Sequence, residues 1–147
     1  MGNEGLSRDG DAVIYYPGGS VHGALPQRER EVNGIVCRAG AWIWFHRNGS
    51  VSSLEPAADV SIGEVGCRAG VRVHFHDNRA LMRCYLSGDG PVGRVPVRAD
   101  TFLVFHENGR LAACRLSRDF EYDGIPCKGG SWFGLHDDGT LKRCIVA

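Results

Sequence analysis

The stretch Phe105-His106-Glu107-Asn108-Gly109-Arg110-Leu111 returns in altered form at a fixed spacing along the chain. Its histidine has counterparts every 30 positions, each preceded by an aromatic residue or a leucine: His46, His76, His106 and His136. Turn-forming pairs keep the same spacing: Gly18-Gly19, Asn48-Gly49, Asn78-Arg79, Asn108-Gly109 and Asp138-Gly139. Agreement over so many columns, without insertion or deletion, indicates an internal repeat.

The repeated unit has the composition of a β-hairpin. Residues 41–46 and their counterparts 71–76 and 101–106 are rich in β-branched and aromatic residues, which favours strands. The Asn-Gly pair predicts a three-residue hairpin loop, in which a type I turn is followed by a glycine in the left-handed conformation. Arg79 stands in place of that glycine, so its hairpin should be strained or differently shaped. A second β-prone piece follows the return strand and ends at 124–127.

No window carries apolar residues at helical spacing over ten or more positions. The sequence therefore predicts an all-β fold with almost no helix, an antiparallel repeat array of β-hairpins that is either a meander or solenoid-like. Two columns of the outgoing strands are uniformly apolar and are predicted to face the core. Their members are Val13, Ile43, Val73, Leu103 and Phe133, and Tyr15, Phe45, Phe75, Phe105 and Leu135.

The alternate columns, which face the other way, vary from unit to unit. They hold Ala12, Trp42, Arg72, Phe102 and Trp132, and Ile14, Trp44, His74, Val104 and Gly134. A structural requirement would have made these columns uniform, so they are the candidate ligand-binding surface. The predicted ligand-binding residues are Trp42, Trp44, Arg72, His74, Phe102 and Trp132. The same aromatic rings would also suit a dimer interface or a second core layer, and the sequence does not separate these three uses.

The cysteines and histidines first suggest a chemical site, but they recur with the 30-residue period of the repeat. The six cysteines fall in two columns, one of Cys37, Cys67 and Cys127 and one of Cys84, Cys114 and Cys144, and form no Cys-x-x-Cys pair. Val97, Leu54 and Ala24 replace them within those columns, so we interpret the cysteines as small buried apolar residues. A histidine that recurs from unit to unit, at His46, His76, His106 and His136, serves the turn rather than one active site, and Asp59, Asp89 and Asp119 have the spacing of turn residues. No catalytic residue, metal ligand or cofactor is predicted.

Composition narrows the range of expected partners and the expected location of the protein. Lys and Arg total 17, as do Asp and Glu, so no overall field attracts nucleic acid or an anionic membrane, and neither partner is expected. The N-terminus lacks the basic and apolar regions of a signal peptide, which predicts a cytoplasmic protein. We expect residues 1–9 to be a flexible tail and residues 10–147 to be a single β-repeat domain. Its units are predicted at about 10–39, 40–69, 70–99, 100–129 and 130–147.

The stretch from Phe105 to Leu111 resembles the MORN-like β-hairpin repeats of bacterial proteins, and the likeness recurs over most of residues 10–147. That resemblance implies an antiparallel sheet used for binding, without catalysis. A short cysteine-containing hairpin array also looks like the peptide-binding accessory proteins of bacterial ribosomal-peptide (RiPP) natural-product biosynthesis. That second likeness implies a role in presenting a precursor peptide to biosynthetic enzymes.

The leading hypothesis is therefore a non-catalytic module that binds a peptide or protein ligand on the aromatic face or along an unpaired edge strand. A homodimer is expected, because an open array leaves edge strands to cover. One alternative is a small cofactor-independent cyclase or isomerase that uses His74 with Arg72 or Asp77. The other is a purely structural or assembly role.

Overall fold

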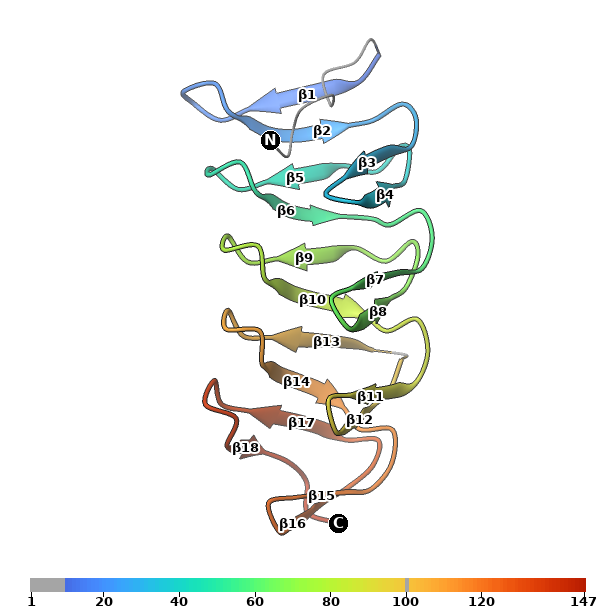
Figure 1. The fold of residues 1–147 in the computed structure, drawn as a ribbon, viewed down its shortest axis with the longest axis vertical. Coiled ribbons are helices and arrows are strands. Elements are labelled where there is room, and N and C mark those ends of the chain that lie inside the picture. Colours follow the sequence, from blue (N-terminus) through green and yellow to red (C-terminus); the bar gives the residue numbers. More distant parts are fainter. Residues whose placement is uncertain (1–9, 100) are drawn as a thin grey trace.

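A computed structural model describes residues 10–99 and 101–147, and the predicted tail 1–9 lies outside these residues. The described chain is all β, with strands and turns and no helix, so the predicted fold class is confirmed. A ten-stranded antiparallel sheet runs the length of the molecule in the order of the chain (Figure 1). Its strands are β1 (Ala12–Tyr15), β2 (Val21–Leu25), β5 (Ile43–Phe45), β6 (Val51–Leu54), β9 (Val73–Phe75), β10 (Leu81–Tyr85), β13 (Phe102–Phe105), β14 (Leu111–Arg115), β17 (Trp132–Leu135) and β18 (Leu141–Arg143). The array is therefore a meander.

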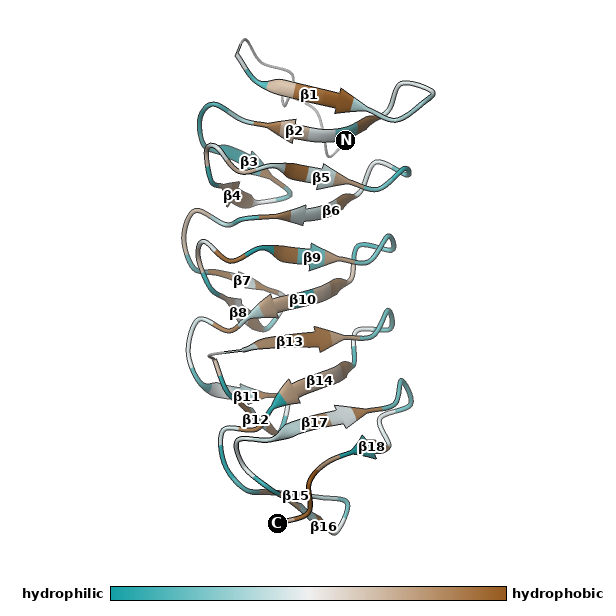
Figure 2. Cartoon of the chain, turned by 180° about the vertical axis from the view of Figure 1, so that it is seen from behind, coloured by the Kyte–Doolittle hydropathy of each residue, from teal (hydrophilic) through white to brown (hydrophobic). Residues whose placement is uncertain are grey.

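Four short hairpins form a second layer over one face of this sheet (Figures 1 and 2). Their strands are β3 (Arg30–Val32) with β4 (Ile35–Cys37), β7 (Val60–Ile62) with β8 (Val65–Cys67), β11 (Gly90–Val92) with β12 (Val95–Val97), and β15 (Phe120–Tyr122) with β16 (Ile125–Cys127). The sequence predicts one β-prone piece here and misses the hairpin. The missed signal is the two-residue turn Asn33-Gly34, where both φ angles are positive (53° and 79°), as a type I′ turn requires.

Each short hairpin also pairs with the following unit. The amide of Arg38 donates to the carbonyl of Glu55 (2.9 Å), and the amide of Ala57 donates to the carbonyl of Val36 (2.9 Å). The same exchange recurs down the array and ends where the amide of Ala147 donates to the carbonyl of Pro126 (3.0 Å). The second layer therefore joins neighbouring units as well as covering the sheet.

The core lies between the two layers, and both predicted core columns point into it. Ile43, Val73 and Leu103 are fully buried, and the phenylalanine column is buried from Phe45 onward. Tyr15 is the exception, with 57% of its surface exposed. Its strand β1 is the edge of the sheet, and the short hairpins of the described chain all follow it in sequence, so the prediction that Tyr15 is core is wrong.

The aligned histidines connect consecutive units. The Nε2 atoms of His46, His76 and His106 each lie 2.9 Å from the carbonyl oxygen of the residue 29 positions later, which is Phe75, Phe105 and Leu135 in turn. Because a carbonyl only accepts, Nε2 carries the proton in each case. Tyr16 fills the same column in the first unit and donates its hydroxyl to the carbonyl of Phe45 (2.6 Å). These three histidines thus have a structural role, but their bonds join neighbouring units, whereas the sequence predicts a bond from each histidine to its own turn.

The aligned asparagines form a second ladder at the turn tips. The amide nitrogens of Asn48, Asn78 and Asn108 donate to the carbonyls of Asp77, Glu107 and Asp137, at 2.8, 2.9 and 2.7 Å. In the unit of residues 130–147, Asp138 replaces asparagine and accepts a hydrogen bond from the amide of Thr140 (2.9 Å). These polar tips line one edge of the molecule (Figure 2).

The turn at Arg79 has the shape of the others. His76 and Ala80 pair through their backbone (2.8 Å) and the amide of Arg79 donates to the carbonyl of His76 (3.0 Å), as Gly109 does to His106 (2.9 Å). Arg79 therefore takes the left-handed conformation with φ of 76°, where its Cβ is crowded. The predicted strain is present without a change of shape.

Arg79→Gly is expected to raise the free energy of unfolding by about 1 kcal/mol, because glycine takes this conformation without the clash. Urea denaturation at neutral pH would measure the change. The converse substitution Gly109→Arg, at the matching position with φ of 88°, should lower stability by a similar amount. Equal stability of Arg79→Gly and the wild type would contradict the account.

Candidate functional site

The face of the ten-stranded sheet turned away from the short hairpins, here called the outer face, carries all six predicted ligand-binding residues. Cross-strand register places Trp44 beside Gly23, His74 beside Ser53, and Trp132 beside Arg115. The six residues named as ligand-binding are all half-buried, and none belongs to the core. The use of these rings as a second core layer is therefore excluded.

An N-terminal aromatic cluster lies on the first two units. The rings of Trp42 and Trp44 stack with centroids 5.1 Å apart, and His22 lies 5.2 Å from Trp44 and 4.2 Å from Tyr16. Gly23 makes this arrangement possible, because a Cβ there would lie 2.6 Å from Cζ3 of Trp44. The Trp44 ring thus rests directly on the backbone of β2.

A C-terminal aromatic cluster lies on the later units and is combined with arginine. Phe102 lies between Trp132 (centroids 5.4 Å apart) and Tyr85 (6.5 Å). The guanidinium of Arg83 lies 5.0 Å from the centroid of Phe102, and that of Arg115 lies 5.9 Å from the centroid of Trp132. Such stacked arginines interact favourably with the rings and still present N–H donors at their edges.

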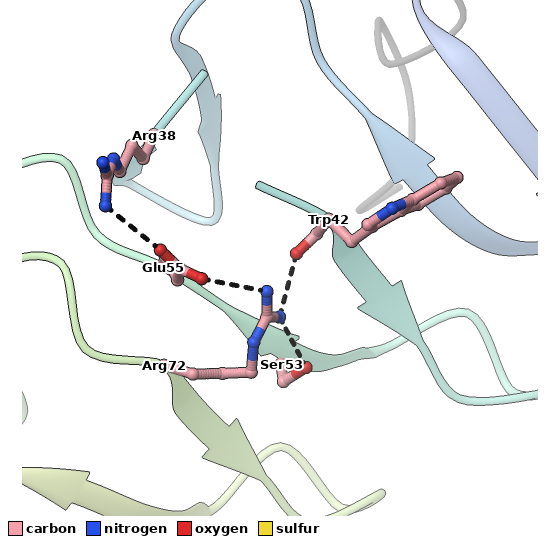
Figure 3. Close-up of polar contacts among 5 residues, drawn as sticks. All are labelled: Arg38, Trp42, Ser53, Glu55 and Arg72. Atoms are coloured by element: carbon pink, nitrogen blue, oxygen red, sulfur yellow. Dashed lines mark hydrogen bonds and ion pairs between the residues drawn. The ribbon is translucent and has the colours of Figure 1, made fainter. Parts of the chain in front are cut away.

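A polar network lies next to the N-terminal cluster, at the backbone of Trp42 (Figure 3). Arg72 donates through one nitrogen to the carbonyl of Trp42 (2.9 Å) and the hydroxyl of Ser53 (3.0 Å), and its other terminal nitrogen lies 3.3 Å from Glu55. Glu55 also pairs with Arg38 at 3.5 Å. The guanidinium of Arg72 is thus engaged in holding the backbone at Trp42, and a direct contact with a ligand stays a prediction.

His74 lies between this network and the C-terminal cluster. Burial lowers the pKa of His74 from its ordinary value, and the charges of Arg83 and Arg72 lower it further. A histidine with a lowered pKa is neutral near pH 7 and can donate one hydrogen bond and accept another.

The lowered pKa of His74 predicts a pH dependence of stability. The pKa of His74 in the folded protein lies below its value in the unfolded chain, which is roughly 6.5. The stability that neutral His74 contributes is therefore present above about pH 6.5 and is lost as the pH falls through the folded-state pKa. We expect the unfolding free energy of the wild type to fall relative to His74→Gln between pH 7.5 and 5. Urea denaturation of both proteins at each pH measures this, and parallel profiles would refute it.

Charge on the outer face is one-sided. Outward-facing positions in the sheet strands, or directly beside a strand end, hold Arg72, Arg83, Arg115 and Arg143. Among the described residues at such positions the one acidic residue is Glu55, which is already paired. Lys and Arg equal Asp and Glu at 17 each over the whole chain, and the turns and short hairpins carry residues of both signs. The outer face is therefore basic and aromatic although the protein is neutral.

Two cavities lie beside the sheet. One of about 610 Å³ lies between the layers, with Ile35, Val51 and Phe75 in its walls. The other, of about 550 Å³, borders Trp132 at the C-terminal end of the outer face. Neither includes Arg72, His74 or Asp77, the residues on which the enzyme hypothesis depends. No three His, Cys, Asp or Glu side chains of the described residues are placed to hold a metal ion.

The chain is a β-hairpin repeat protein with two layers, defined by its own period and topology. Comparison with protein-family models, curated proteins and solved structures finds no match. The described part of the chain has no helix with the length and hydropathy needed to cross a membrane.

Several residues of the outer face escaped the sequence prediction. Tyr85, Arg83 and Arg115 lie on return strands, where a β-bulge after each turn shifts the alternation by one residue. The prediction considered only the outgoing strands. The glycine inside a β-rich stretch, Gly23, was the available signal for a close approach of a ring to the backbone.

Proposed function

We propose that the protein is a non-catalytic binding module whose outer face binds a peptide segment rich in carboxylates and apolar side chains. One observation carries the proposal. Half-buried aromatic clusters and arginines occupy the sheet face that the second layer leaves uncovered, while the opposite face alone forms the core. Aromatic residues and arginine are the side chains most enriched where proteins bind one another.

Charge supports an anionic ligand. The stacked guanidinium of Arg83 is exposed, and Arg143 is exposed at the C-terminal end of the same face. Carboxylates would pair with these donors, and the neighbouring rings would bury apolar side chains. The turns and short hairpins carry basic as well as acidic residues, so they offer an anionic ligand no comparable one-sided positive charge.

The packing of the rings favours a peptide over a single-stranded nucleic acid. Proteins that bind single strands offer successive free ring faces on which bases stack. Here Trp42 and Trp44 stack on each other with an angle of 18° between their planes, and Trp44 lies against Gly23. The Arg72–Glu55 network then interrupts the aromatic surface.

We further propose that the chain is a MORN-like repeat protein of bacteria. In this proposal it is a cytoplasmic homodimer that presents a precursor peptide to enzymes of ribosomal-peptide natural-product biosynthesis. The recurring hairpin motif, best matched from Phe105 to Leu111, supports the first part. The exposed side chains Ile14 and Tyr15 at one end of the sheet, and Ile145 and Val146 at the other, support self-association.

Tryptophan fluorescence tests the proposal directly, because all three tryptophans of the chain lie on the outer face. A peptide of Asp, Glu, Leu and Phe would be titrated into the protein at low and high salt. We expect a saturable change in emission that weakens with salt. A control peptide with Lys in place of Asp and Glu should leave the emission unchanged.

Other outcomes would replace the proposal. Equal binding of both peptides would remove the charge argument, and preferential binding of an oligothymidylate would assign the face to nucleic acid. A tight dimer in sedimentation, with tryptophan emission that changes on dilution and not with peptide, would assign it to self-association.

A further inference from the structure

The two cysteine columns meet across the layers. Cysteines 17 positions apart are brought together twice, at Cys67 with Cys84 and at Cys127 with Cys144. The same offset leads from Cys37 to Leu54 and from Val97 to Cys114, so the other two units hold one cysteine each. The pairing crosses between columns and was not foreseen from the 30-residue period.

The pair at the C-terminal end is in close contact. The Sγ atom of Cys127 donates to that of Cys144 at 2.7 Å, whereas a disulfide bond measures about 2.05 Å. Cys127 ends β16, and Cys144 follows β18 in the segment that pairs with it through Val146 (Figure 1). Both thiols are free.

The two pairs differ in access. Cys67 and Cys84 are 0% and 1% exposed, so solutes do not reach them in the folded protein. Cys127 is equally buried, but Cys144 is half-buried and lines the cavity of about 550 Å³. The chain thus contains an accessible dithiol and, 60 residues earlier, a buried one of the same construction.

The cavity beside Cys144 is cationic. Arg115, Lys128 and Arg143 line it together with Trp132. None of the ion pairs formed among the described residues involves these three side chains. Their charges favour an anionic solute in the cavity.

The two thiols are unequal. Burial, and then the hydrogen bond and the charge of Cys144, raise the pKa of Cys127 to about 12. Cys127 therefore keeps its proton and donates it to the sulfur of Cys144. Cys144 has the access and the surroundings of an attacking thiol, and Cys127 those of a resolving thiol.

We propose that Cys144 and Cys127 form a thiol–disulfide exchange site that accepts an anionic low-molecular-weight disulfide in the cationic cavity. The proposal does not rest on peptide binding, although Arg115, Trp132 and Arg143 of the outer face also line this cavity.

The exchange is balanced without a further oxidant. The Cys144 thiolate attacks one sulfur of the disulfide, whose S–S bond breaks, and one thiolate leaves as a protein mixed disulfide forms. Cys127 then loses its proton and attacks the sulfur of Cys144, and the second thiolate leaves. The bound disulfide is reduced to two thiols, which take up the protons of the two cysteines, and the protein dithiol is oxidised to a disulfide.

The test uses the reduced full-length protein with glutathione disulfide, and with the cationic disulfide cystamine. Reaction would be stopped by alkylation and followed by intact mass and peptide mapping. We expect one intramolecular disulfide, between Cys127 and Cys144, with Cys67 and Cys84 still alkylated after unfolding. Lys128→Gln with Arg143→Gln should lower the rate ratio of glutathione disulfide to cystamine by about tenfold.

Substitutions by residues that occur elsewhere in the same columns separate the roles of Cys127 and Cys144. Cys127→Val, which introduces the residue that Val97 supplies in the same column, should stop the reaction at the mixed disulfide on Cys144. Cys144→Ala, which likewise introduces the residue found at Ala24, should abolish it. Equal oxidation of the Cys67–Cys84 pair, an unreactive Cys144, or a rate ratio indifferent to Lys128 and Arg143 would each overturn the proposal.

Discussion

His76→Ala is expected to lower the free energy of unfolding by about 2 kcal/mol. The substitution removes the bond from Nε2 of His76 to the carbonyl of Phe105 (2.9 Å) and leaves that partly buried oxygen without its partner. A typical hydrogen bond contributes about 1 kcal/mol, and an abandoned buried acceptor costs about 1–3 kcal/mol. Because the bond joins two units, its loss weakens the interface on which a repeat array depends. Urea denaturation followed by circular dichroism would measure the change.

Two variants control for the loss of an imidazole. His136→Ala removes the exposed histidine of the last unit and should change stability by less than about 0.5 kcal/mol. His76→Tyr should retain most of the stability, because Tyr16 fills this column in the first unit and donates to Phe45 (2.6 Å). If His136→Ala cost as much as His76→Ala, the bond between units would not be the cause.

Arg83→Glu is expected to weaken binding of the carboxylate-rich peptide by about 2 kcal/mol, which is roughly thirtyfold in Kd. Arg83 is exposed, and its guanidinium lies 5.0 Å from the centroid of Phe102. Reversal of its charge removes a donor and places like charges together. The titration of tryptophan fluorescence gives Kd for both proteins.

Arg94→Glu makes the same change in net charge on the opposite layer. Arg94 lies at the turn of the β11–β12 hairpin, and its pair with Asp123 (3.5 Å) is exposed, so the pair contributes little to stability. We expect the peptide affinity of Arg94→Glu to stay within about threefold of the wild type. Equal losses in both variants would show an effect of overall charge and not of the outer face.

The repeat made the fold predictable because each column answers one structural need. The buried aromatic at the end of β5, Phe45, and the histidine beside it recur because every unit has the same sheet position and the same neighbour. The ends of the array were predicted less well. Tyr15 obeys the column and is exposed, because burial depends on a neighbouring unit that no local pattern encodes.

The candidate site was predictable only in part, for a related reason. Trp44 and His74 differ from the other residues of their column, and this difference correctly placed them on the outer face. It did not predict the function of that face. Arg72 departs from its column too, yet its guanidinium bonds to Trp42 and Ser53. The pairing of Cys127 with Cys144 depends on how the second layer folds back, and the period alone contains no such information.

The central claim is that ligands bind the outer face and not the layer of short hairpins. Nuclear magnetic resonance of ¹⁵N-labelled protein during titration with the carboxylate-rich peptide tests it most directly, since the three indole N–H signals all belong to that face. We predict shifts of the indole signals and of amides in β10 and β14, with the amides of β7 and β8 unchanged. Shifts confined to the short hairpins, with all three indole signals unmoved, would contradict the account.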